Sequence, residues 1–101
     1  MKYYHVTSEE NLESVLQDGL RPSSTYHPTD RPIKPTVFLA TSPFWAAMYG
    51  SSDGVVLEVS VKDRSLLKRS HLGDPSHERL YYGRIGPEDL KVLGDVDEYL
   101  H

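Results

Sequence analysis

The 101-residue chain contains no cysteine, which excludes disulfide bonds, thiolate zinc ligands and a cysteine nucleophile. It also has no excess of positive charge, because 11 lysines and arginines face 15 aspartates and glutamates, and the net charge is −4. This sign argues against a protein that coats nucleic acid through bulk electrostatics, although it permits a local basic patch. No apolar run approaches the roughly 20 residues of a membrane span, and the first residues resemble no signal peptide. We therefore expect a single domain over residues 1–101, located in the cytoplasm and not bound to membranes.

Two helices are predicted from their capping signals. Ser8 is a good N-cap for a helix that ends at Gly19, where a left-handed residue is favoured. Ser42 and Pro43 are an N-cap and a first helical residue, and they open a shorter helix that Gly50 ends. A third helical turn fits residues 63–70.

The strands are predicted from residue type and from alternation of apolar and polar side chains. The clearest strand carries Val55, Leu57, Val59 and Val61 on one face. Including it, about five strands are expected, at 2–6, 37–40, 55–61, 78–82 and 90–93. Because strict alternation of strand and helix stops after the second helix, an α+β domain with mixed or antiparallel sheets fits better than a doubly wound parallel sheet. The acidic tail at 95–98 is expected to fray.

The segment 21–36 contains four prolines and few large apolar residues, which predicts a surface loop stiffened by proline. Arginine, lysine and histidine make it locally basic. Loops of this length are uncommon in small domains unless they have a function.

Single residues offer weak signals for chemistry. His5 is most simply a hydrogen-bonded structural imidazole, and Tyr49 an aromatic residue of the core or its rim. Glu78 at a strand start and Glu58 within a strand are most simply solvated carboxylates. We predict no metal site, because the spacing of the remaining internal histidines matches no zinc pattern: His27, His71 and His77.

Three blocks of residues, taken in order, carry a stronger signal. The first runs from His5-Val6-Thr7 through Asn11 to Val15-Leu16-Gln17-Asp18-Gly19-Leu20-Arg21; the second joins Val37-Phe38-Leu39-Ala40 to Ala46-Ala47-Met48-Tyr49; the third is Glu78-Arg79-Leu80-Tyr81-Tyr82, followed by Leu90-Lys91-Val92. In this order and spacing the chain resembles the ADP-ribosyltransferase superfamily, on the poly-ADP-ribose polymerase-like branch with its small bacterial and phage members.

The resemblance implies a fold and an activity. The fold would have two small mixed or antiparallel sheets around an NAD cleft, with two or three short helices. NAD would be the substrate, and ADP-ribose would pass to an unidentified acceptor (protein, nucleic acid or small molecule) with release of nicotinamide. Small transferases of this kind are often toxins or phage effectors, which is an analogy at the level of the fold.

The resemblance also implies roles for individual residues. His5 would hydrogen-bond the adenosine ribose, the Val6 backbone would bind the nicotinamide amide, and Arg21 would seat the adenosine half. Tyr49 would stack on the nicotinamide ring, and Glu78 would stabilise the cation that develops as the glycosidic bond breaks. His5, Tyr49 and Glu78 would form the catalytic set. Three further residues would belong to the NAD-binding set: Thr7, Phe38 and Ala40.

Three positions depart from the family pattern. Val6 replaces a glycine, Phe38 replaces the middle tyrosine of the family's His-Tyr-Glu triad, and Ala46 replaces a serine. Two alternatives therefore stay open. One is a non-catalytic module that binds NAD, ADP-ribose or a protein partner. The other is an RNA 2′-phosphotransferase, whose arginine-rich and histidine-rich site suits an acidic chain poorly.

Overall fold

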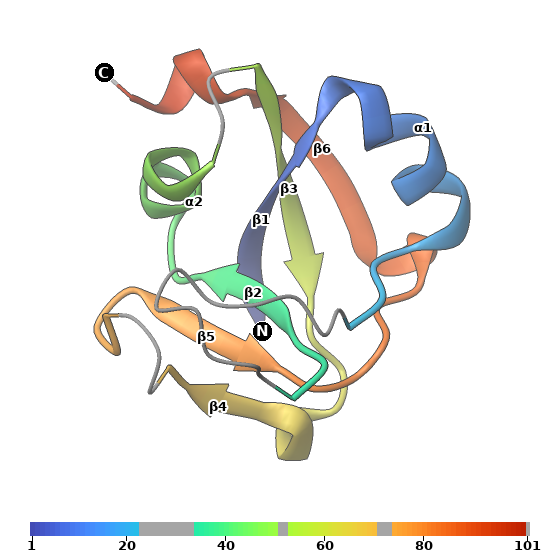
Figure 1. The fold of residues 1–101 in the computed structure, drawn as a ribbon, viewed down its shortest axis with the longest axis vertical. Coiled ribbons are helices and arrows are strands. Elements are labelled where there is room, and N and C mark those ends of the chain that lie inside the picture. Colours follow the sequence, from blue (N-terminus) through green and yellow to red (C-terminus); the bar gives the residue numbers. More distant parts are fainter. Residues whose placement is uncertain (23–33, 51–52, 71–73, 101) are drawn as a thin grey trace.

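The computed structural model describes residues 1–22, 34–50, 53–70 and 74–100. Most of the segment 21–36, where a surface loop stiffened by proline is expected, lies outside these residues. Figure 1 shows a sheet with helices packed beside it. The strands and helices in chain order are β1 (Lys2–Ser8), α1 (Glu9–Asp18), β2 (Val37–Ala40), α2 (Pro43–Tyr49), β3 (Gly54–Ser60), β4 (Leu67–Arg69), β5 (Glu78–Tyr81) and β6 (Leu90–Asp95). Three 3₁₀ turns complete the described elements: η1 (Arg64–Leu66), η2 (Pro87–Asp89) and η3 (Val96–Tyr99).

The strands form one six-stranded sheet in the order β4-β5-β2-β1-β3-β6, and every neighbouring pair is antiparallel. The α+β class is confirmed, whereas the expectation of two small sheets is wrong. The reason is one residue pair, Tyr4 with Ala40, which joins β1 to β2 and so connects the two halves. By contrast, β1 and β3 pair along seven residues, from Lys2–Ser60 to Ser8–Gly54.

Both faces of the sheet are covered by apolar side chains, whereas the alternation along β3 predicts a single apolar face. Val59 and Val61 belong to a cluster that Val15 of α1 packs against. Val56 belongs to a second cluster that includes Ala46 and Ala47 of α2. Because successive side chains of a strand point to opposite faces, α1 and α2 lie on opposite sides of the sheet.

The helix ends follow the capping signals. The Ser8 hydroxyl accepts a hydrogen bond from the Asn11 N–H at 3.2 Å, and the Ser42 hydroxyl accepts one from the Trp45 N–H at 3.2 Å. Gly19 ends α1 with φ 83°, a conformation that other residues rarely adopt. A Cβ at this position would lie 2.1 Å from the Ile85 carbonyl oxygen, so close packing also requires glycine.

The later part of the chain departs from the sequence-based expectation in two places. The helical turn expected at 63–70 is limited to η1, and the residues after it form the short edge strand β4. The tail expected to fray forms η3, because Val96 is buried against α2 and anchors it. In the described parts of the chain, no helix is long and apolar enough to cross a membrane.

Candidate active site

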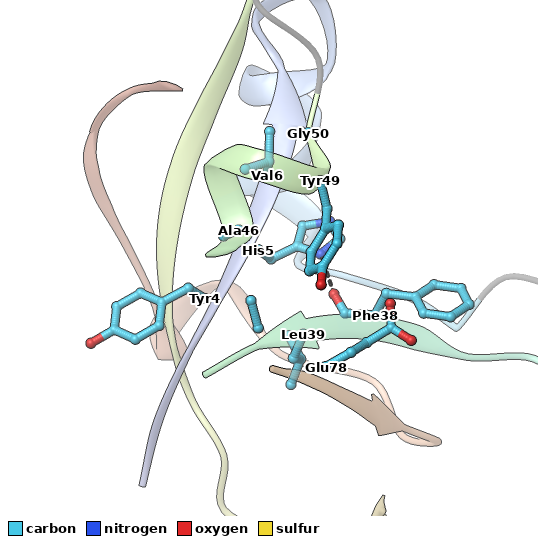
Figure 2. A pocket seen from close by; sticks show the side chains of 10 residues that line it. Tyr4, His5, Val6, Phe38, Leu39, Ala46, Tyr49, Gly50 and Glu78 are labelled. Atoms are coloured by element: carbon cyan, nitrogen blue, oxygen red, sulfur yellow. Dashed lines mark hydrogen bonds between the residues drawn. The ribbon is translucent and has the colours of Figure 1, made fainter. Parts of the chain in front are cut away.

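A cavity of about 170 Å³ opens where β1 and β2 separate beyond their single residue pair. Figure 2 shows the side chains of His5, Tyr49 and Glu78 reaching this space from β1, α2 and β5. Segments 73 residues apart in the sequence therefore meet here, because the sheet order places β5 beside β2 and β2 beside β1. Six of the eight predicted site residues line the cavity: His5, Val6, Phe38, Ala40, Tyr49 and Glu78.

The His5 ring bridges the gap between the separating strands. Its Nδ1 lies 2.7 Å from the Phe38 carbonyl oxygen. Since a carbonyl only accepts, Nδ1 carries the hydrogen and donates it. Burial lowers the pKa of His5, and the hydrogen bond to Phe38 opposes that effect only in part. The ring is therefore neutral near pH 7, and its Nε2 is a hydrogen-bond acceptor.

Tyr49 is the last residue of α2 and is 55% exposed. Its ring stacks on Trp45, with centroids 6.1 Å apart and planes 28° apart. Loss of hydration raises the pKa of the Tyr49 hydroxyl, and the nearby charges of Asp74 and Glu78 raise it further. The phenol therefore stays protonated at physiological pH and can donate a hydrogen bond.

Glu78 is the first residue of β5 and pairs with Ala40 of β2. One of its carboxylate oxygens, Oε1, accepts a hydrogen bond from the hydroxyl of the buried Ser70. Its backbone N–H donates to the Asp74 carbonyl oxygen at 2.9 Å. The Ser70 bond orients the carboxylate and the backbone bond holds the start of β5, at a cavity that Tyr49 also lines. Ser70 was missed by the sequence analysis, because its partnership with Glu78 depends on the pairing of β4 with β5.

The bulk that Val6 adds is accommodated by Gly50 at the end of α2. A Cβ on Gly50 would lie only 2.5 Å from Val6 Cγ1, so the valine side chain fills the space beside this glycine. Ala46 is buried in α2, and Phe38 lines the cavity beside His5. The departures from the family pattern are therefore packed into the cavity wall.

A second, more open cavity of about 450 Å³ adjoins the first, and His5 lines both. Thr7 and Arg21, the remaining residues singled out by the sequence, line this second cavity. Polar side chains from one face of α1 also line it: Asn11, Ser14 and Asp18. The sequence analysis did not single out Ser14 or Asp18. Their spacing from Asn11, three and seven residues, was an available signal, because such residues share one helix face.

In residues 1–22, 34–50, 53–70 and 74–100, no three histidine, aspartate or glutamate side chains are placed to hold a metal ion. Two of the histidines considered above, His27 and His71, lie outside the described residues.

No protein-family model matches the chain, and no curated protein matches it in sequence.

Proposed function

We propose that the protein is an NAD-dependent ADP-ribosyltransferase, which moves ADP-ribose from NAD to an acceptor and releases nicotinamide. The observation that carries the proposal is the meeting of His5, Tyr49 and Glu78 around one cavity, with a second cavity that His5 also lines. Three residues selected from the sequence by their order thus share one small space. A histidine, a tyrosine and a glutamate chosen at random from the sequence would not be expected to line one cavity.

The two cavities suit the two halves of a dinucleotide. The smaller, apolar cavity would hold the nicotinamide against the Tyr49 ring, whose electron-rich face attracts a flat cation. The larger cavity would hold the adenosine half beside Thr7 and Arg21. His5 lies between them, and its Nε2 would accept a hydrogen bond from the adenosine ribose. Drug-sized ligands usually occupy about 300–1,000 Å³; the larger cavity lies within this range, whereas the smaller one lies below it and would hold only part of the dinucleotide.

The reaction is a displacement at the anomeric carbon of the nicotinamide ribose. The carbon–nitrogen bond breaks, its electron pair leaves with nicotinamide, and the ring nitrogen loses its positive charge. Positive charge develops on the sugar, and the Glu78 carboxylate would stabilise it. The acceptor nucleophile then forms the new bond to the same carbon, and its proton passes to Glu78 or to water. The Ser70 hydroxyl supports this role, because it orients the carboxylate without neutralising it.

The test is nicotinamide release from NAD by the wild type, Glu78→Gln and Glu58→Gln. Glu58 is a matched control, because it lies on β3, forms an ion pair with Lys2 at 2.9 Å and does not line either cavity. We expect Glu78→Gln to lower turnover by about two orders of magnitude or more, because the variant loses the charge that stabilises the transition state. Glu58→Gln should keep wild-type turnover, and both variants should remain folded by circular dichroism.

The alternatives give different results in the same assay. A wild type that binds ADP-ribose without releasing nicotinamide would be a binding module, and the transferase proposal would be wrong. Removal of a 2′-phosphate from RNA in the presence of NAD would identify a phosphotransferase. Equal turnover by wild type and Glu78→Gln would remove Glu78 from the mechanism.

A further inference from the structure

His77 and Trp45 connect the two elements that carry Tyr49 and Glu78. The His77 imidazole stacks on the Trp45 indole with ring centroids 3.7 Å apart and planes 16° apart. Trp45 in turn stacks on Tyr49. His77 directly precedes Glu78, and Trp45 lies one helical turn before Tyr49. A continuous series of ring contacts therefore runs from the start of β5 to the end of α2.

His77 is held by two backbone hydrogen bonds and one contact of its ring. The His77 carbonyl accepts a hydrogen bond from the Thr41 N–H at 2.9 Å, just before α2 begins. The His77 N–H donates to the Asp74 carbonyl at 3.1 Å, and the ring Nε2 lies 3.7 Å from a carboxylate oxygen of Asp74. These contacts hold the imidazole, which is only 28% exposed, against the Trp45 ring.

We propose that His77 is a positioning residue whose ring, through Trp45, sets the distance between the Tyr49 phenol and the Glu78 carboxylate. This inference rests on the proposed function. The nicotinamide and the reacting carbon of NAD are only a few ångströms apart, so Tyr49 and Glu78 must be placed correctly relative to each other. Tyr49 lies at an exposed helix end, and the only described ring that it contacts in residues 34–50 and 74–100 is Trp45. A misplacement of about 1 Å at such a site can cost roughly a hundredfold in rate.

The experiment compares His77→Ala with His77→Phe and with the control Phe44→Ala. His77→Phe keeps a flat ring that can stack. Phe44 contacts the same indole edge-on, with centroids 5.3 Å apart, but both rings belong to α2, so this contact does not join α2 to the start of β5. Turnover number and KM for NAD are measured by nicotinamide release, and the melting temperature is recorded for every variant. If His77→Ala does not fold, His77→Gln takes its place.

We expect His77→Ala to lower kcat by about tenfold to a hundredfold, with a much smaller change in KM, because alignment rather than binding is lost. His77→Phe should restore most of kcat, and Phe44→Ala should keep it. The proposal is overturned if His77→Phe loses as much as His77→Ala, if His77→Ala retains its kcat, or if Phe44→Ala loses as much.

A second readout separates this inference from the proposed function. Trp45 is the only tryptophan of the chain, so its indole signals in NMR spectra are assigned without ambiguity. We expect cross-peaks between the Trp45 and Tyr49 rings to weaken in His77→Ala and to return in His77→Phe. If the wild type releases no nicotinamide, the proposed function fails. The positioning role then stands if these cross-peaks change as expected, and it fails if they are unchanged.

Discussion

The contact between Gly50 and Val6 provides a quantitative test of how the cavity wall is built. Gly50 has φ −88° and ψ 174°, which any residue adopts, so alanine brings no backbone strain at this position. A Cβ there would lie 2.5 Å from Val6 Cγ1 and 2.7 Å from Val6 Cβ. Carbon atoms pack favourably at about 3.5–4.0 Å, so Gly50→Ala forces α2 and β1 apart.

The size of the effect follows from two opposing contributions to the free energy of unfolding. Overpacking a well-filled site costs about 1–3 kcal/mol. Replacing glycine by alanine also restricts the unfolded chain, which raises the free energy of unfolding by about 0.4–1 kcal/mol. We therefore expect Gly50→Ala to lower the free energy of unfolding by roughly 1–2 kcal/mol.

A double-mutant cycle with Val6→Gly isolates the clash, because this change removes all three Val6 atoms that the new Cβ would meet. Val6→Gly alone should be destabilising, since it loses packing and places glycine in a strand. In the Val6→Gly background, Gly50→Ala should be neutral or stabilising, so the two changes should couple by about 1 kcal/mol or more. Urea unfolding followed by Trp45 fluorescence measures each variant. A stable Gly50→Ala protein, or effects that simply add, would refute the packing argument.

Three further predictions concern pH, the core and the carboxylate. Burial holds the pKa of His5 below its ordinary value, so the stability that this residue contributes is complete above about pH 6.5 and is lost as pH falls towards the folded pKa, by up to about 1.4 kcal/mol per pH unit. Urea unfolding at pH 7.5 and 5.5 should therefore show a smaller pH dependence for His5→Gln than for wild type; equal dependence would contradict the burial argument. Leu57→Ala, in the fully buried middle of β3, should cost about 2–5 kcal/mol in the same assay, whereas Val92→Ala on the exposed side of β6 should cost under about 0.5 kcal/mol. Similar losses for the two variants would show that the core has been misidentified. Ser70→Ala should lower kcat by about tenfold, the worth of one hydrogen bond, with little change in KM; a loss as large as that of Glu78→Gln would mean that Ser70 does more than orient the carboxylate.

Local signals in the sequence predicted the helices and most strands correctly. Ser8 and Ser42 cap the helices as expected, because an N-cap bond depends only on residues three positions apart. The alternation along β3 did not predict that Val56 is buried on the opposite face, but it predicted the apolar face with Val59 and Val61, since the period of a strand is fixed by the backbone. These features require no knowledge of distant parts of the chain.

Features that depend on distant pairing could not be predicted from local patterns. The single Tyr4–Ala40 pair joins the two halves into one sheet, and no local sequence pattern indicates whether such a pair forms. The three residues of β4 are too few for an alternating pattern, and Val96 anchors η3 only because α2 lies beside it.

The candidate site also combines residues that were predicted from the sequence with contacts that depend on the fold. The residues His5, Tyr49 and Glu78 were selected from the sequence by their order within a resemblance, and their shared cavity appears only in the fold. The partners Ser70 and His77 act through contacts across strands or between rings, which leave no periodic trace in the sequence.

The most direct test of the central claim is a crystal structure of the protein with a non-hydrolysable NAD analogue. We predict the pyridine ring against Tyr49, the adjoining ribose hydrogen-bonded to the Glu78 carboxylate, and the adenosine ribose at Nε2 of His5. An analogue bound elsewhere, or one whose nicotinamide ribose lies beyond hydrogen-bonding reach of Glu78, would contradict the account.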